Sequence, residues 1–274
     1  MVSQQSRLDS SILIDLEGAR FDLQPSYALT DRWTIGADLP LIVYYGGVLD
    51  SVVDAVDRAV GTPSPQRKQL GHNVYHFELT HAGDAPFAPA PANFGLGDLA
   101  LELRWRALEQ ASGGVAPDLS LTAVVEPPTG DPGLAHGNGA VDFGFDAELG
   151  KTLGDFRLSA TAGLVVPGDP TRLPGISADP AFSGLLAGAY AVTAAWNLIA
   201  QVDYRPSPYR GSGVDAISAA SSELAVGFRW SPAEPPVTLE AAFVEGLVNG
   251  ASPDFSALIS LSYRLPSGLS PAPP

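Results

Sequence analysis

Histidines and carboxylates are the side chains of this sequence with the clearest capacity for chemistry. His72, His76 and Glu78 fall on one face if their segment is extended, and two imidazoles with a carboxylate can bind a divalent metal ion. Their spacing is loose and no third histidine completes the set. A solvated loop face is therefore the preferred interpretation, with metal binding as a secondary hypothesis.

No catalytic or phosphate-binding motif stands out. A hydrolytic site would need a serine and a histidine close together, with a third group that orients the histidine. All four histidines fall in predicted loops. Gly95-Leu96-Gly97-Asp98 precedes a predicted strand and lacks the lysine of a phosphate-binding loop, so it predicts a turn, as does Pro127-Pro128-Thr129-Gly130-Asp131. We expect neither an enzyme nor a bound cofactor.

Composition excludes further classes of function. The chain has 30 acidic and 15 basic residues and a formal net charge of -15, which argues against nucleic-acid binding. It has no cysteine, so disulfides and thiolate metal sites are excluded. Hydrophobic residues make up 45% and charged residues 16%, yet no run approaches the roughly 20 apolar residues of a spanning helix. The apolar residues must fill a core or face lipid in another way.

The dominant pattern is an alternation of apolar and polar residues, which predicts β-strands. Residues 139–153 show it most clearly, with Val141, Phe143 and Phe145 on one face and Asp142 and Asp146 on the other. No segment between the strands predicts a crossover helix, so neighbouring strands should be antiparallel. About 12 such segments, most of them near bilayer-spanning length, can be placed: 10–17, 19–29, 33–45, 95–107, 117–127, 139–150, 155–167, 181–192, 196–206, 219–230, 236–246 and 254–264.

The polar faces of these strands carry charges of both signs. In a soluble β-sandwich they would face water, whereas in a membrane barrel they would line the lumen and pair across strands. The charged residues predicted to share this face are Asp38, Glu102, Arg104, Arg106, Glu126, Asp142, Asp146, Glu148, Arg157, Asp203, Arg205, Glu223, Arg229 and Glu240.

Connection lengths and aromatic positions favour the barrel. Tight turns such as residues 30–32 and 151–154 alternate with longer loops rich in Gly, Pro, Asp and Ser, as in outer-membrane barrels. The apolar face carries an aromatic girdle at the tight-turn end, which suits a membrane interface. Its members are Trp33, Trp105, Trp196, Trp230 and Tyr263. Both chain termini are expected at that end. Residues 1–7 do not resemble a signal peptide, so the barrel hypothesis expects one to be encoded upstream.

The first long connection, residues 46–94, breaks the alternation. Leu49, Val52, Val53 and Val56 recur at helical spacing, which predicts a short amphipathic helix ended by the glycine and proline that follow residue 60. Residues 73–81 predict an extra strand, which we place outside the barrel. The expected organisation is one barrel over residues 1–264, in which residues 46–94 form an extracellular loop, and a Pro/Ser-rich tail over residues 265–274.

Several short motifs resemble an uncharacterised family of Gram-negative outer-membrane proteins, a domain of unknown function. The motifs are Tyr27-Ala28-Leu29-Thr30-Asp31-Arg32, Gly36-Ala37-Asp38-Leu39-Pro40-Leu41, Gly46-Gly47-Val48-Leu49-Asp50, Phe94-Gly95-Leu96-Gly97-Asp98 and Pro128-Thr129-Gly130-Asp131. The family is distantly similar to outer-membrane barrels assigned to the phenol-degradation (MetA) pathway. The resemblance covers the first half specifically and the second half in strand rhythm. It implies a single outer-membrane barrel and supplies no substrate or catalytic residue.

The resulting hypothesis is an integral, multi-pass β-barrel of the bacterial outer membrane. Its contacts would be outer-membrane lipid and a small solute, without nucleic acid. Because acidic residues outnumber arginines on the polar face, a narrow channel with a cation-favouring lumen is the first reading. A closed structural barrel whose extracellular loops bind a partner is the first alternative. A soluble β-sandwich or barrel that acts as a binding module is the second.

Overall fold

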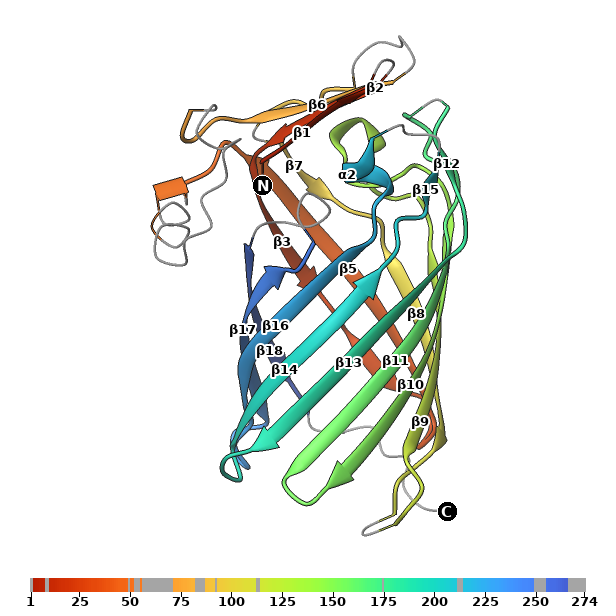
Figure 1. The fold of residues 1–274 in the computed structure, drawn as a ribbon. Helices are drawn as coiled ribbons and strands as arrows, with labels where there is room; N and C mark the ends of the chain where they lie inside the picture. Colours follow the sequence, from red (N-terminus) through yellow and green to blue (C-terminus); the bar gives the residue numbers. More distant parts are fainter. Residues whose placement is uncertain are drawn as a thin grey trace.

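The computed structural model describes residues 2–7, 10–48, 50–51, 55, 71–81, 87–91, 93–111, 114–173, 175–210, 214–248 and 255–265. Within these ranges the regular secondary structure is almost entirely β-strand (Figure 1). Most of it forms one 13-stranded sheet. The strands of this sheet are β3 (Glu17–Leu23), β4 (Ser26–Ala28), β5 (Trp33–Tyr45), β7 (Asn93–Leu96), β8 (Ala100–Leu108), β9 (Asp118–Glu126), β10 (Asp142–Leu153), β11 (Phe156–Val166), β13 (Ala181–Ala191), β14 (Trp196–Arg205), β16 (Ser221–Trp230), β17 (Val237–Gly246) and β18 (Phe255–Tyr263).

The sheet follows the chain up and down. Its order is β18-β17-β16-β14-β13-β11-β10-β9-β8-β5-β3, with β4 and β7 paired to β5 off this path, and the neighbours are antiparallel. The predicted all-β, antiparallel, up-and-down arrangement is therefore confirmed. No pairing joins β3 to β18 among the described residues, so the predicted closure of the sheet is not observed as a hydrogen-bonded seam.

The predicted set of about 12 strands differs from the observed sheet at three places. Segment 10–17 is not part of the sheet. Segments 19–29 and 95–107 are each divided in two, which gives β3 with β4 and β7 with β8. The β3–β4 division lies opposite Ala37, whose N–H donates to Pro25 O at 3.0 Å, whereas the β7–β8 division lies beside Pro40 of β5. Pro40 has no N–H to donate, and opposite it the β7–β8 chain carries one extra residue, a bulge in which Gly97 N–H donates to Pro40 O at 2.9 Å.

The two faces of the sheet differ in character. Large apolar side chains on one face stay in contact with the surroundings, for example Phe145 (50% exposed), Leu186 (61%) and Leu198 (58%). The few fully buried apolar residues include none of these side chains. A water-soluble sheet buries such a face in a core. This sheet leaves it exposed along its length, which is the arrangement expected of strands that contact lipid.

Strands of the sheet are tilted and wrap around a common axis, with tight connections at one end, the turn end, and long ones at the other, the loop end (Figure 1). A separate three-stranded sheet, in the order β1 (Val2–Arg7), β2 (Ser10–Asp15) and β6 (His76–His81), lies across the loop end. Two predictions are corrected here. Segment 10–17 forms β2 of this small sheet, and β1 lies at the loop end rather than beside the tight turns.

The loop end holds the small hydrophobic core of the molecule, which we call the cap core. Ile12 of β2, Leu79 of β6, Ile176 and Val214 pack together with exposed fractions of 1–5%. A short helix, α2 (Asp215–Ser218), and the strand pair β12 (Ser177–Ala178) and β15 (Tyr209–Arg210) lie beside it (Figure 1).

The predicted amphipathic helix between residues 49 and 60 stays a prediction. Its apolar positions, Leu49, Val52, Val53 and Val56, lie outside the described residues. Among the helices that the described ranges contain, none has the length and apolarity to cross a membrane.

Candidate functional site

The sheet register places the predicted charged residues on one face. Residues directly opposite each other in neighbouring strands share a face. Asp38 lies opposite Ala100, Glu126 opposite Asp142, and Asp203 opposite Glu223, and the two-residue period carries the assignment along each strand. Arg229 lies opposite Glu240 in the same way. We call this surface the charged face. The exposed apolar side chains occupy the other face.

Three ion pairs on the charged face join different strands of the first half of the sheet. Arg104 of β8 contacts Glu148 of β10 at 3.0 Å, reaching across β9. Arg157 of β11 contacts Asp118 of β9 at 3.2 Å. Side chains of second-neighbour strands converge on the concave side of a curved sheet and diverge on its convex side. These two contacts therefore place the charged face on the concave side. The third pair, Arg20 of β3 with Asp38 of β5, measures 3.2 Å.

Arginines of the second half are also paired. Arg205 lies beside Asp203 and 3.8 Å from Glu223, and Arg229 pairs with Glu240 across β16 and β17. Between these pairs most side chains on the charged face of β13–β18 are small and apolar. The side chains there include Ala187, Ile199, Ala225 and Ala242, as the register shows.

Four carboxylates of the charged face form no ion pair among the described residues. They are Glu102, Glu126, Asp142 and Asp146, on β8, β9 and β10. Asp142 accepts hydrogen bonds from Asn138 Nδ2 (2.8 Å) and Gly168 N–H (2.7 Å). Glu126 lies directly opposite Asp142, and like charges in that relation repel. Excess negative charge is therefore concentrated on one side of the concave surface.

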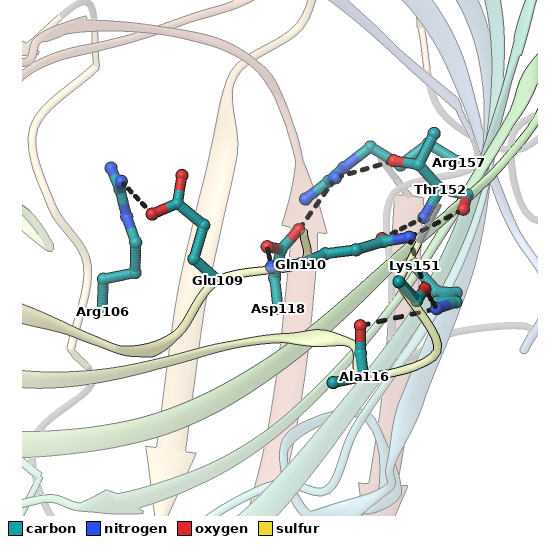
Figure 2. Close-up of polar contacts among 9 residues, drawn as sticks. Arg106, Glu109, Gln110, Ala116, Asp118, Lys151, Thr152 and Arg157 are labelled. Carbon is teal, nitrogen blue, oxygen red and sulfur yellow. Dashed lines mark hydrogen bonds and ion pairs between the residues drawn. The ribbon is translucent and has the colours of Figure 1, made fainter. Parts of the chain in front are cut away.

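At the turn end a polar network ties the β8–β9 and β10–β11 hairpins together (Figure 2). Lys151 Nζ donates to Gly114 O (2.6 Å) and Val115 O (2.7 Å), and Gln110 exchanges two hydrogen bonds with the backbone of Thr152. Arg106, one of the predicted charges, pairs with Glu109 at 3.7 Å within its own hairpin. Sequence reasoning missed Lys151 and Gln110, because their partners are mostly backbone carbonyls.

The residues predicted to form an aromatic girdle lie at the turn end on the apolar face. Trp33 and Trp105 are directly opposite in β5 and β8 and stack with 5.9 Å between ring centroids. Trp196 and Trp230 are opposite in β14 and β16 at 6.3 Å, and Tyr263 lies opposite Val237. The four tryptophans thus form two pairs on neighbouring strands.

Residues 127–141 connect β9 to β10 near the loop end. The first 13 of them, residues 127–139, form the mouth loop, which lies against the charged face. Asp98 Oδ1 accepts a hydrogen bond from Gly130 N–H at 2.8 Å, and Thr129 Oγ1 both donates to Gly97 O (3.1 Å) and accepts from Leu99 N–H (2.7 Å). The two glycine-containing motifs that predicted turns therefore contact each other. Neither motif alone indicates this contact.

His136 anchors the same loop deeper in the molecule. It is 3% exposed, and its Nε2 lies 2.6 Å from Asn93 Oδ1. Its ring lies 5.8 Å from that of Tyr44, whose hydroxyl donates to Ala135 O at 3.3 Å. Burial lowers the pKa of His136, an effect that the nearby Asp131 carboxylate partly opposes. The sequence placed His136 in a loop and assigned it no role.

The weak metal candidate does not assemble. His76 and Glu78 lie in β6, opposite Asp15 and Leu13 of β2, and His72 lies in the preceding turn. No group of three or more His, Cys, Asp or Glu side chains in the described part of the chain is arranged to hold a metal ion.

An antiparallel up-and-down sheet with an exposed apolar face, a charged concave face and aromatic residues at one end defines an all-β barrel fold of the outer-membrane type. The chain belongs to the family described as Protein of unknown function (DUF3187), whose model matches residues 5–265. The predicted resemblance to an uncharacterised family is thereby confirmed. No curated protein matches the sequence.

Two solved structures are similar in fold. The COG4313 outer membrane channel from Pseudomonas putida F1 has a TM-score of 0.53 and 16% identity, with 92% of this chain and 84% of that chain covered. The toluene transporter TbuX from Ralstonia pickettii has a TM-score of 0.40 and 13% identity, with 88% and 65% covered. At this identity the first likeness concerns the fold alone.

Proposed function

We propose that this protein is an outer-membrane β-barrel channel for small solutes, with a lumen that favours cations. The observation that carries the proposal is the division of the sheet into an exposed apolar face and a concave charged face. On the concave face the arginines are paired, and Glu102, Glu126, Asp142 and Asp146 form no ion pair with any residue that the structure describes. Carboxylates that line a pore favour cations over anions.

The apolar face supports membrane insertion. Within the described ranges no layer of protein covers side chains such as Leu198 and Phe182 (72% exposed), and Trp33 and Trp105 mark the turn end. A continuous exposed apolar surface of this size is unfavourable in water. Embedded in a bilayer, the same surface is solvated by lipid, and the aromatic pairs lie at headgroup level. The fold likeness to an outer membrane channel points the same way.

Conductance in planar bilayers tests the proposal. The purified protein should give discrete current steps. In a KCl gradient its reversal potential should shift toward the equilibrium potential of potassium. The double variant Glu102→Gln/Asp146→Asn should lower the potassium-to-chloride permeability ratio at least about fivefold per charge, since a unit charge at 4–8 Å contributes about 0.5–1 kcal/mol in a water-like dielectric, with opposite signs for the two ions. Asp155→Asn, which removes a carboxylate from a tight turn outside the charged face, is the matched control and should leave the ratio unchanged.

Two other outcomes identify the alternatives. A protein that inserts and shows a heat-modifiable band shift, but never conducts, is a closed barrel, and its loops become the functional surface. The cap core at the loop end is the observation that favours this second candidate. A protein that stays in the aqueous phase without detergent, with no band shift, contradicts membrane insertion altogether.

A further inference from the structure

The mouth loop lies against the charged face, on the side that the proposed channel would use. Gly95 lies opposite Ile42, and Asn93 opposite Tyr44, so these four residues project to the same face as Asp38. A Cβ on Gly95 would lie 2.5 Å from His136 Nδ1, and one on Gly97 would lie 2.8 Å from the Pro40 ring. His136 therefore rests directly on the backbone of β7. Only glycine at position 95 leaves room for it.

The hydrogen bonds around Asn93 assign the proton on His136. Asn93 Nδ2 donates to Ala90 O at 2.7 Å, which leaves Oδ1 as the acceptor that faces the imidazole. His136 Nε2 therefore carries the hydrogen and Nδ1 is unprotonated. Nδ1 is buried and has no hydrogen-bond partner among the described residues. Docking of the mouth loop thus suits the neutral imidazole, because a proton on Nδ1 would be buried without an acceptor.

We infer that His136 is the positioning residue that holds the mouth loop inside the channel entrance, and that protonation of His136 releases the loop and widens the entrance. The widening, though not the anchoring, rests on the proposed channel function. The groups that face the imidazole are Asn93 and Gly95 of β7, Tyr44 of β5 and Asp131 of the loop itself. Among the residues that the structure describes, Asp131 is the one charge that acts on the imidazole, and its attraction for the imidazolium does not replace the missing acceptor.

The direction of the pH effect follows from burial. In the docked loop the pKa of His136 lies below its ordinary value of 6.5, whereas in a released loop it returns to that value. The released state therefore binds more protons. Docking is fully favoured above about pH 6.5 and weakens as the pH falls from there toward the lowered pKa.

Protease cleavage of the folded, detergent-solubilised protein tests the anchor without reference to conduction. His136→Ala should raise cleavage within residues 127–139 about tenfold at neutral pH, because local opening exposes the loop. His136→Gln retains a side-chain N–H for Asn93, so its loop should be protected from cleavage as in the wild type. Because glutamine cannot titrate, lowering the pH should increase cleavage in the wild type but not in His136→Gln. Band shift on heating shows whether each variant is folded.

A second substitution disturbs the contact between His136 and Gly95 from the side of β7. Gly95→Ala should release the loop with His136 intact, and the double variant Gly95→Ala/His136→Ala should be no more sensitive than either single one. Gly188→Ala is the control, because its Cβ meets Leu158 Cδ2 at an ordinary 3.6 Å on the apolar face.

Conductance then separates the inference from the proposed function. Single-channel conductance should rise at least about twofold in His136→Ala and Gly95→Ala, and should rise in the wild type, but not in His136→Gln, when the pH is lowered. If the wild type conducts and the mouth loop is equally protected from protease in all variants, His136 does not anchor the loop. A released loop with unchanged conductance overturns the widening. Absence of conductance in every protein overturns the channel and with it the widening, while the cleavage series still decides the anchor.

Discussion

Arg104 and Glu148 show what a paired charge on the concave face contributes. The pair joins β8 to β10 at 3.0 Å, and its side chains remain 53% and 33% exposed. Solvent screening at such exposure limits a pair to about 0–1 kcal/mol of stability. Arg104→Gln should therefore lower the free energy of unfolding in detergent by less than about 1 kcal/mol.

Selectivity should respond more clearly than stability to the same pair. Arg104→Gln leaves Glu148 as an added free carboxylate and should raise the potassium-to-chloride permeability ratio. Glu148→Gln leaves Arg104 without its partner and should lower that ratio. Reversal potentials of the two variants, measured against the wild type, check the prediction. Shifts in the same direction for both would show that this pair does not face the permeation path.

Individual residues also show where sequence reasoning reaches its limit. Alternation assigned Arg104 and Glu148 to the polar side of their strands, and the register agrees. It could not identify them as partners, because that requires the order of strands and the offset between them. The role of His136 lay further out of reach, since its contacts with Asn93 and Gly95 bring together segments about 40 residues apart.

Two tight turns share one local design. Thr30 Oγ1 accepts from Arg32 N–H (3.2 Å) and Trp33 N–H (3.0 Å), and Thr193 Oγ1 accepts from Ala195 N–H (3.2 Å) and Trp196 N–H (3.1 Å). Each threonine precedes by three residues the tryptophan that opens the next strand. The hydroxyl satisfies turn N–H groups and fixes the start of that strand.

Removal of the hydroxyl should weaken these hairpins. Thr193→Val keeps the shape of the side chain and loses the acceptor, so it should cost about 1 kcal/mol in the free energy of unfolding. Thr193→Ser retains the acceptor and should cost clearly less. Denaturant unfolding in detergent micelles, followed by tryptophan fluorescence, measures both. Equal losses for the two variants would show that the methyl group, rather than the hydroxyl, stabilises the turn.

At the scale of elements, the long strands were predictable and the exceptions have physical causes. The strands of the large sheet from β9 to β18 match their predicted segments closely, because an apolar face and a charged face impose a strict two-residue period. β2 has the same alternation, since Ile12 and Ile14 face the cap core. Periodicity cannot distinguish a strand that faces lipid from a short strand that covers a small core. Only its pairing with β1 and β6 does so.

The molecule combines two parts that are stabilised differently: the 13-stranded sheet, which we call the wall, and the cap, which is the cap core with the strands β1, β2 and β6. Pairing between long strands stabilises the wall, whereas the cap depends on a few buried side chains from β2, β6 and two connections. Tyr209 joins the cap core, and its pKa is raised by burial and, to a smaller extent, by the carboxylates of Asp142 and Asp98. The cap therefore lies close to the carboxylates at the loop end of the charged face.

A cap of this kind should open without loss of the wall. Val214 is 1% exposed at the centre of the cap core, and Val214→Asp would bury a charge without a partner. The variant should retain the heat-modifiable band shift of the folded wall, while β2 and β6 lose protection from amide hydrogen exchange and single-channel conductance rises. Val115→Asp adds the same charge at a residue that is 93% exposed at the turn end and should change neither quantity. If Val214→Asp instead removes the band shift, the cap and the wall fold as one unit, and the entrance cannot open by release of the cap alone.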